Sequence, residues 1–469
     1  MNLTHYYIKY KSSKGKYYLV NTLRGTFEEI NETIYGDLEK LENSQTDISP
    51  QSMDFLKDWK VITNDEDEKS FIKQAYTGFL NRPYKHGTFF FYLSYDCNLS
   101  CTYCNYKLIT DPVKRTMSIE SIDKAFDALY TLLESGVKHE EITLVLFGGE
   151  PFLIRNQRLI LHFLHRYRAL KMRYNIQYNL IVFSNGIELP YFIKSYKEEI
   201  EAISSVYITL SGNEETHNQS RIFLNNKGSY SKVIKGIDFT INSGVKTWLV
   251  FNAMQENIHQ LHDVNNIIEE KGWNLKDNFL GCCVSRIKSR GDKSVETFTE
   301  TALVESVISL VKTSSLNLRY FNFEDMRILK NIMLLLNNKS PQNIHTQNIL
   351  QFNGCGNRIY QYSFTPEGEI YPCSPSIGNR ELSIGRYIPQ LSMEYPLSKA
   401  WTFKHEYFSS ECNTCNMAFL CGGGCKYSII KEGLNTEECD SIRRLFPAFI
   451  ECIENNIDLV NNETVYEKV

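Results

Sequence analysis

The 469-residue sequence lacks the features of several simple classes of protein. No apolar run reaches the ~18 residues of a membrane span. Residues 1–7 lack the charged and apolar segments of a secretion signal. The formal net charge is only −4, so no basic field over the whole chain favours nucleic acid. We therefore expect a cytoplasmic protein with no membrane and no nucleic-acid partner.

Hydrophobic residues and cysteine are well represented. Hydrophobic residues make up 42% of the chain, which fits a globular protein with room for two or three domains. Thirteen cysteines in a reducing compartment indicate metal binding rather than disulfides. Cys282, Cys283 and Cys452 have no obvious partners. The other ten form three spaced groups: Cys97, Cys101 and Cys104; Cys355 and Cys373; and Cys412, Cys415, Cys421, Cys425 and Cys439.

The first group has the spacing C-x3-C-x2-C and directly follows an apolar run at 89–94, which predicts a buried strand. Cysteine thiolates hold iron–sulfur clusters. Three thiolates can hold three irons of a cubane and leave the fourth iron open for chemistry, like the open position of a catalytic metal. Out of context, the spacing also fits a zinc loop or three buried thiols.

Residues 1–85 are predicted to form a separate small module. Two apolar runs at 6–10 and 16–21 predict a hairpin, and 31–41 and 50–59 predict two short helices. A short strand is expected at 61–62. The acidic run at 65–68 is predicted to be an exposed turn or linker. This order resembles the winged-helix leader-peptide recognition domain of peptide-modifying enzymes, although a dimerisation or packing element fits equally well.

Strands and helices are predicted to alternate six times over residues 86–315, which is typical of a parallel sheet with crossover helices. We expect a partial (β/α)6 barrel of the TIM type, with its chemistry at the carboxyl ends of the strands. Cys282 and Cys283 lie within the sixth strand, where core packing is expected of them. The predicted strands are 89–95, 142–147, 176–183, 206–210, 247–253 and 279–284, and the predicted helices are 119–133, 157–170, 191–203, 230–242, 258–270 and 300–311.

The ends of three further strands carry glycine and small polar residues. Each such segment alone is explained by an ordinary turn, but together, at matching ends of consecutive strands, they favour a site. Adjacent glycines let the backbone approach a ligand closely. The residues are Gly148, Gly149, Glu150 and Pro151 after the second strand, Ser184 and Asn185 after the third, and Thr209 and Arg221 at and beyond the end of the fourth.

With these motifs, residues 89–315 resemble the radical S-adenosylmethionine enzymes. The resemblance implies that Cys97, Cys101 and Cys104 ligate a [4Fe–4S] cluster whose open iron binds S-adenosylmethionine. The remaining residues would bind the cofactor. Tyr103 would pack on the adenine, Gly148, Gly149, Glu150 and Pro151 would form the methionine-binding motif, Ser184, Asn185 and Thr209 would lie near the ribose, and Arg221 would lie near the methionine carboxylate.

Residues 316–350 are predicted to be a helical linker, with its best helix at 323–336, and residues 351–469 a cysteine-rich domain with a C-terminal helix. Cys355 and Cys373 flank a predicted hairpin around Pro366-Glu367-Gly368. The later cysteines read C-x2-C-x5-C-x3-C and then C, for which two zinc sites are an alternative on spacing alone. The whole pattern resembles the SPASM extension of radical S-adenosylmethionine enzymes.

The SPASM resemblance implies two auxiliary [4Fe–4S] clusters, and therefore three clusters in all. Cys412, Cys415, Cys421 and Cys439 would hold the outer one, and Cys355, Cys373 and Cys425 the inner one. No thiol precedes Cys355 where some family members supply a fourth inner ligand. Two alternatives remain for that position: an open or non-cysteine site, or ligation by a distant residue.

The resemblance as a whole implies a maturase that abstracts hydrogen from a ribosomally made precursor peptide. The product would be a thioether, carbon–carbon or carbon–oxygen cross-link or a similar modification. The expected partners are a precursor peptide with its leader and an electron donor such as flavodoxin or ferredoxin. An anaerobic sulfatase maturase that forms formylglycine is the alternative within the family, and a non-catalytic iron–sulfur carrier or sensor is the alternative outside it. No catalytic acid or base is named, because packing explains the candidates Tyr362, Glu367, Glu369 and Tyr371 equally well.

Overall fold

The computed structural model describes most of the chain. Cys355 and most of the residues around it lie outside the described part, as do several loops. The described residues are 2–80, 86–104, 106, 115–135, 139–287, 298–314, 316–323, 326–336, 350–352, 360–393, 410–432 and 436–457.

One eleven-stranded sheet forms the centre of the protein, in the order β12-β11-β10-β9-β8-β7-β6-β13-β14-β15-β16. The six predicted strands are confirmed, and they pair in parallel in chain order. Parallel neighbours cannot be joined by a short turn and need a long crossover connection, usually a helix, which the sequence also predicts. The six strands are β6 (His86–Ser94), β7 (Glu141–Gly148), β8 (Gln177–Ser184), β9 (Ser205–Thr209), β10 (Thr247–Ala253) and β11 (Phe279–Arg286).

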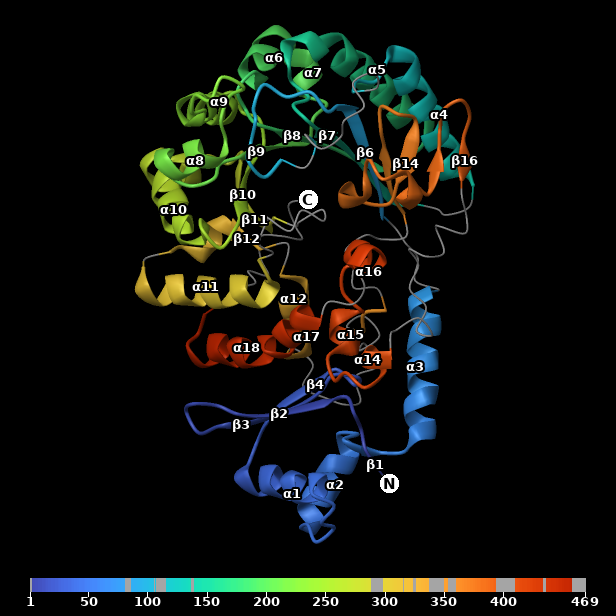
Figure 1. Cartoon of the computed structure of the whole chain (residues 1–469), viewed down its shortest axis with the longest axis vertical. Helices are drawn as coiled ribbons and strands as arrows, with labels where there is room; N and C mark the ends of the chain where they lie inside the picture. The colour runs from blue at the N-terminus through green and yellow to red at the C-terminus, as the bar shows by residue number, and fades with distance from the viewer. Residues whose placement is uncertain are drawn as a thin grey trace.

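Helices cover the outer face of these strands in an arc (Figure 1). The predicted helix at 191–203 is divided into α6 and α7, because Tyr196 leaves the helical region at φ −136° and ψ 61°. The helices are α4 (Ile119–Glu134), α5 (Gln157–Arg173), α6 (Leu189–Ser195), α7 (Lys197–Ile200), α8 (Glu214–Ser220), α9 (Tyr230–Asn242), α10 (Leu261–Glu270) and α11 (Glu300–Thr313).

The two faces of the sheet bury different side chains, as strand alternation requires. Residues such as Phe91 and Leu249 point outward into the main core beneath the helices, where both are fully buried. Cys282 belongs to this outer core, whereas Cys283 packs on the other face with Trp248. Both thiols are buried, as the expectation of core packing requires.

The C-terminal hairpin extends the barrel sheet, which the sequence did not predict. The hairpin consists of β13 (Gln361–Phe364) and β14 (Glu369–Tyr371), and β13 pairs in parallel with β6. At the other edge, β12 (Phe321–Asn322) pairs with β11, although only helical structure was expected there. The remaining C-terminal elements are β15 (Gly385–Arg386), β16 (Ser392–Met393), α12 (Arg327–Leu336), α14 (Ser410–Asn413), α15 (Ala418–Cys421), α16 (Lys426–Glu432), α17 (Thr436–Arg443) and α18 (Leu445–Glu454).

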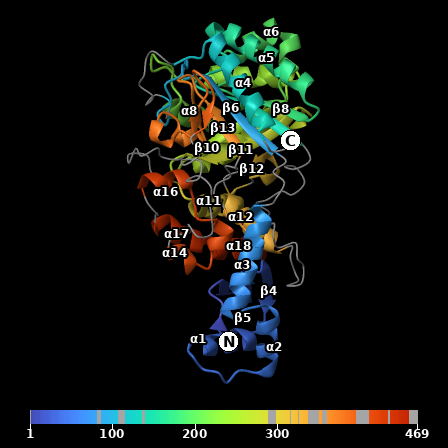
Figure 2. The same cartoon turned by 90° about the vertical axis from the view of Figure 1, so that its right-hand side faces the viewer.

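The N-terminal module has its own small core and contains the predicted hairpin and helices. A third strand extends the hairpin to an antiparallel sheet in the order β2-β3-β4. Figure 2 shows the module at one end of the molecule, below α18. Its elements are β1 (Asn2–Leu3), β2 (Tyr7–Lys11), β3 (Tyr17–Asn21), β4 (Thr26–Ile30), α1 (Glu32–Glu42), α2 (Pro50–Asp58), β5 (Ile62–Thr63) and α3 (Asp65–Leu80).

The prediction of a turn or linker at 65–68 is wrong, because these four acidic residues form the first turn of α3. Asn64 lies just before the helix, and its Oδ1 accepts a hydrogen bond from the Asp67 N–H at 2.8 Å. Carboxylates at this end also interact favourably with the helix dipole. A charge run that looks like a solvated turn is therefore the start of a helix.

The module is not isolated from the rest of the chain. The Tyr18 hydroxyl donates to Glu454 Oε1 at 3.2 Å, and the rings of Tyr6 and Phe419 meet edge to face. Helices α14 to α18 lie between the module and the barrel (Figure 1). Within the described part of the chain, every helix is too short or too polar to cross a bilayer.

Candidate functional site

The loop that carries Cys97, Cys101 and Cys104 leaves the carboxyl end of β6, as predicted. Two backbone bonds hold it against the segment after α8: Ser100 N–H donates to Ile222 O at 2.6 Å, and Thr102 N–H donates to Ser220 O at 2.9 Å. Cys101 is buried, whereas the other two thiols are half-buried. The loop is therefore positioned by backbone contacts as well as by its own sequence.

Gly148 and Gly149 let the end of β7 contact this loop. A Cβ atom on Gly149 would lie 2.1 Å from Asp96 O, and one on Gly148 would lie 2.5 Å from Ser94 O. The Gly149 N–H donates to Ser94 O at 2.9 Å, and the Glu150 N–H donates to Asp96 O at 2.8 Å. The two glycines therefore allow the end of β7 to approach the backbone of the cysteine loop closely.

Glu150 lies at the centre of the site and is fully buried. Its carboxylate accepts from Ser184 Oγ at 2.9 Å, Asn185 N–H at 2.6 Å and Phe152 N–H at 3.0 Å. Burial raises its pKa to about 7, against the lowering effect of these hydrogen bonds. The structure therefore brings together the predicted residues that follow β7 and β8. Pro151, which follows Glu150, is also buried.

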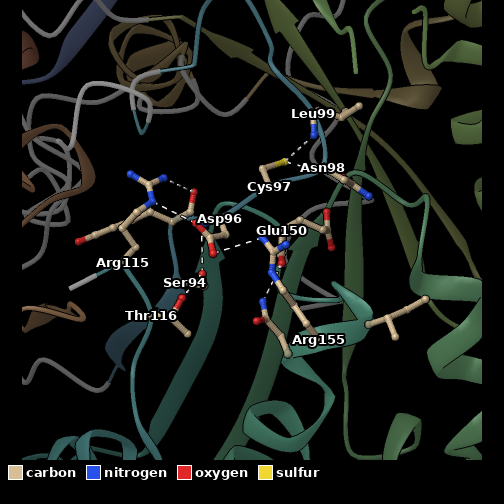
Figure 3. Close-up of polar contacts among 12 residues, drawn as sticks. Ser94, Asp96, Cys97, Asn98, Leu99, Arg115, Thr116, Glu150 and Arg155 are labelled. Carbon is tan, nitrogen blue, oxygen red and sulfur yellow. Dashed lines mark hydrogen bonds and ion pairs between the residues drawn. The ribbon is translucent and has the colours of Figure 1, made fainter. Parts of the chain in front are cut away.

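Asp96, immediately before Cys97, is held between two arginines (Figure 3). Its carboxylate lies 3.0 Å from Arg115 Nε and 3.2 Å from Arg155 Nη2. This contact cannot be predicted from the sequence, because the two arginines belong to separate segments and have no motif. The available signal is an acidic residue directly before Cys97.

Arg221 and Tyr103 meet at the opposite side of the cysteine loop. Arg221 Nη1 donates to the Tyr103 hydroxyl at 2.9 Å, and Asn252 Nδ2 lies 3.4 Å from the same oxygen. Burial opposes the charge on Arg221, but Tyr103 and Cys101 outweigh it and raise the pKa of the guanidinium. Among the described residues, the buried Nε of Arg221 has no hydrogen-bond partner. A buried cation with a donor to spare is suited to an anionic ligand.

Two further residues near the fourth strand differ in how deeply they are buried. Thr209 ends β9 and is half-buried. His217 is fully buried, and its Nδ1 accepts from Ser211 N–H at 3.3 Å while its Nε2 lies 3.1 Å from Ser229 Oγ. Burial lowers the pKa of His217 to about 2, so that the imidazole is neutral and holds the turn together.

The C-terminal cysteines are distributed over several packing groups. Cys373 and Cys425, two of the predicted inner ligands, pack together with Leu382 and Tyr427. The predicted outer ligands Cys412, Cys415, Cys421 and Cys439 are all half-buried. Residues 422–424 are three consecutive glycines with φ of 67°, 85° and 80°, a left-handed path that favours glycine. Cys355 lies outside the described residues.

The cysteine loop has the chemistry of an iron–sulfur site. Burial raises the pKa of Cys97 to about 12, and the nearby Glu150 adds to this effect. A thiolate at this position therefore requires a cation such as iron to stabilise it. The Leu99 N–H already points at Cys97 Sγ at 3.3 Å, as is common around cluster sulfurs (Figure 3).

The donor set of the loop suits an iron–sulfur cluster, because cysteine thiolates are the usual ligands of such clusters. Among the described residues, no three Cys, His, Asp or Glu side chains converge in the manner of ligands to one metal ion.

Comparison with known proteins agrees with this fold. Residues 91–266 match the family described as "Radical SAM superfamily". The cysteine-type anaerobic sulfatase-maturating enzyme of Clostridium novyi is 23% identical over 353 residues, covering 71% of this chain and 86% of that protein. The same enzyme from Clostridium perfringens is 21% identical over 350 residues, covering 70% and 86%. The structure described as "Native anSMEcpe with bound AdoMet" aligns with a TM-score of 0.59 at 17% identity, covering 80% of this chain and all of that one.

The fold and the site define an enzyme in which a cofactor-binding barrel is extended by a further C-terminal domain. Residues 91–266 form a radical S-adenosylmethionine domain, and the chain is an enzyme. That domain implies S-adenosylmethionine and a [4Fe–4S] cluster as cofactors. The alternative of a non-catalytic carrier or sensor is therefore set aside.

Proposed function

We propose that the enzyme is a peptide maturase that abstracts hydrogen from a ribosomally made precursor and installs a cross-link or a similar modification. The catalytic part of this proposal rests on one observation. The cysteine loop contacts a buried group formed by Glu150, Ser184 and Asn185. Such a site would hold a cluster and its sulfonium ligand at one edge of the barrel.

Each residue of the site has a proposed role. Cys97, Cys101 and Cys104 hold the cluster. Glu150, with Gly148, Gly149 and Pro151, receives the methionine ammonium, and Ser184 and Thr209 lie on the ribose side. Tyr103 flanks the adenine, and Arg221 neutralises the methionine carboxylate. When bound, the cluster supplies the electron that cleaves S-adenosylmethionine to a 5′-deoxyadenosyl radical.

The inner face of the barrel excludes water from this chemistry. Phe147, Phe183, Tyr207 and Trp248 come from four neighbouring strands and form a continuous row of ring contacts, with centroids 4.7 Å, 4.8 Å and 6.1 Å apart. Gly281 makes room for this row, because a Cβ there would lie 2.9 Å from the Trp248 ring. An apolar lining protects a radical from quenching.

The C-terminal cysteines are proposed to hold two auxiliary [4Fe–4S] clusters, with the outer and inner ligand sets given above. The packing of Cys373 against Cys425 supports the inner set. An auxiliary cluster beside the barrel can accept the electron left when a substrate radical closes to a bond. The fourth inner position is open, held by a non-cysteine group or ligated by a distant residue.

Two observations support a peptide substrate. A solved relative of this fold, at a TM-score of 0.56 and 17% identity, is described with a bound peptide, "Cp18Cys". This chain is also longer: the sulfatase-maturase structure aligns over its whole length but covers only 80% of this one. We propose that residues 1–85 belong to the additional part and bind the leader of the precursor, and that a flavodoxin or ferredoxin supplies electrons.

The second candidate is an anaerobic sulfatase maturase, which converts Cys or Ser to formylglycine. The observation that favours it is the similarity to the two Clostridium enzymes over about 70% of the chain. The two candidates share the cofactor and a peptide substrate, and they differ in the product.

Mass spectrometry of peptides incubated with the reduced, anaerobically purified full-length enzyme distinguishes the candidates. One arm is the small peptide encoded beside this protein, and the other is a sulfatase-derived peptide that contains the target Cys. A cross-link removes two hydrogens and keeps the sulfur, whereas formylglycine formation replaces the sulfur by oxygen. Modification of the sulfatase peptide alone would contradict the primary proposal.

A further inference from the structure

Asn185 does not have the contacts expected of a ribose-binding side chain. Its Nδ2 donates to Asn98 Oδ1 at 2.7 Å and points at Cys97 Sγ at 3.7 Å, and its Oδ1 accepts from Ile187 N–H at 3.0 Å. Both amide hydrogens are therefore used within the protein, one of them on the sulfur of a proposed cluster ligand.

The orientation of this amide is fixed at both ends. Ile187 N–H can only donate, so the atom that it contacts on Asn185 must be the oxygen. At the other end, the carboxylate of Glu188 can only accept: its Oε1 accepts from Asn98 Nδ2 at 2.8 Å, and its Oε2 accepts from Ile154 N–H at 2.7 Å. The oxygen of Asn98 must then face Asn185, whose NH2 group must face Cys97.

We infer that Glu188 and Asn98 are positioning residues that aim the Asn185 amide at Cys97 Sγ, and that this hydrogen bond raises the reduction potential of the S-adenosylmethionine-binding cluster. The inference rests on the proposed assignment of Cys97 as a cluster ligand. Glu188 lies outside the sequence motifs of the site, and Asn98 occupies an unspecified position of the C-x3-C-x2-C motif.

The physical reason is the charge that the cluster gains on reduction. An N–H directed at a ligating sulfur stabilises the more negative, reduced form more than the oxidised form. The outer hydrogen-bond partners of metal ligands tune a site in this manner. The Leu99 N–H makes a similar contact at 3.3 Å, but it belongs to the backbone of the loop itself. Of these two contacts, the one from Asn185 depends on a side chain from another segment.

Glu188 also joins three segments that build the site. Through Asn98 it contacts the cysteine loop, through Ile154 it contacts the segment after β7, and it follows β8 itself. A glutamine at this position would have one acceptor atom for two donors. If the glutamine oxygen keeps the bond from Ile154 N–H, its NH2 group faces Asn98, and the orientation of the Asn98 amide is reversed.

The test is a redox titration, followed by EPR, of the anaerobically purified full-length enzyme and its Glu188→Gln and Asn98→Leu variants. The cluster in question is recognised by the change of its signal on adding S-adenosylmethionine. We expect both variants to titrate at more negative potentials than the wild type. The double variant should shift no further than the larger single shift, because both substitutions act through one hydrogen bond. Glu198→Gln, on the exposed face of α7, is the matched control and should titrate as the wild type.

Iron content separates a positioning role from a structural one. If Glu188→Gln binds less iron than the control, Glu188 also has a structural role. The potential measured for Asn98→Leu then decides whether the hydrogen bond tunes the cluster. A wild-type potential in an Asn98→Leu variant with full iron content overturns the inference, as do shifts that add in the double variant. A wild-type enzyme with no signal that responds to S-adenosylmethionine would instead refute the proposed assignment of Cys97, and the inference would fall with it.

Discussion

The two cysteine-bearing regions of this enzyme are held in place by different means. The loop at 97–104 is fixed by the protein itself, through backbone bonds to the end of β7 and to the segment after α8, and through the carboxylate of Asp96. The C-terminal cysteines lie on short helices and glycine turns and are divided among separate packing groups.

This difference indicates what each region would require from the clusters that we propose for it. A pre-organised loop keeps its shape without a cluster, and the cluster then supplies chemistry. A region of short elements gains its order from ligation, as small metal-binding domains do. We therefore expect substitutions in the first region to change the reaction, and substitutions in the second to change the folding of the C-terminal part.

Gly149→Ala should have the largest effect among the changes that leave all cysteines in place. The new Cβ would lie 2.1 Å from Asp96 O and 2.6 Å from the Tyr95 carbonyl carbon, both of which are backbone atoms, so the cysteine loop must move. Overpacking of this kind costs about 1–3 kcal/mol, and a shift of about 1 Å at a reacting site can cost roughly 100-fold in rate. The measurement is 5′-deoxyadenosine formation by the reduced enzyme.

The matched control is Gly36→Ala in α1, where an added Cβ meets nothing within 4 Å. It should leave the rate unchanged and stabilise the helix slightly. Equal rates for the two alanine variants would show that the loop does not depend on the close approach of β7.

Cys421→Ala should act on the second region. Cys421 packs against the main core at the end of α15, just before the three consecutive glycines. Loss of one proposed outer ligand should lower the iron content from about twelve to about eight per chain, and should speed amide hydrogen exchange in α15 and α16. Exchange in β6 and β7 should not change. Faster exchange throughout the barrel would contradict the division into two regions.

The sequence predicts the barrel well, because each strand and helix has its own periodic pattern. All six strands were found, and helix α9 was predicted with its observed bounds, Tyr230–Asn242. The acidic start of α3 was mistaken for a turn, because its charge run outweighed the capping role of Asn64. The pairing of β13 with β6 could not be predicted, because a strand pattern carries no information about a distant partner.

The candidate site shows the same limit: contacts between distant segments cannot be predicted from the sequence. The motifs identified Glu150, Ser184 and Asn185, which the structure brings together around one carboxylate. The roles of Asn98 and Glu188 depend on hydrogen bonds between segments, and the sequence contains no pattern for them. The role of Asn185 near the ribose stays a prediction, and the contacts of its side chain direct it at Cys97 Sγ.

Tyr95→Phe tests the link between the two regions. The buried Tyr95 hydroxyl donates to Glu367 Oε2 at 2.9 Å, in the turn between β13 and β14. A hydrogen bond to a charged group contributes about 1.5–3 kcal/mol, so we expect a lower free energy of unfolding and faster exchange at the β13–β14 turn.

Tyr196→Phe is the control for this substitution, since its hydroxyl donates to Gln157 Oε1 at 2.9 Å on the outer helices. Its effect should be smaller, about 0.5–1.5 kcal/mol, and should stay local. If the Tyr95 variant loses no more stability than the Tyr196 variant, the turn is not held to the cysteine loop by this contact.

Arg155→Gln should have the smallest effect. Its side chain is 63% exposed, so the ion pair with Asp96 is screened by water and contributes at most about 1 kcal/mol. Arg115→Gln should cost more, because Arg115 is more buried and also donates to Tyr95 O at 3.3 Å. Thermal unfolding at low and high salt measures both, and a larger loss for Arg155→Gln would contradict this ranking.

The central claim is that three sulfurs at the edge of the barrel hold the cluster that cleaves S-adenosylmethionine. The direct measurement is 5′-deoxyadenosine released by the anaerobic, reduced full-length enzyme and by a variant with Cys97, Cys101 and Cys104 all replaced by Ala. We expect the variant to keep the circular dichroism of the wild type and about eight irons, and to release no 5′-deoxyadenosine. Release at the wild-type rate would contradict the claim.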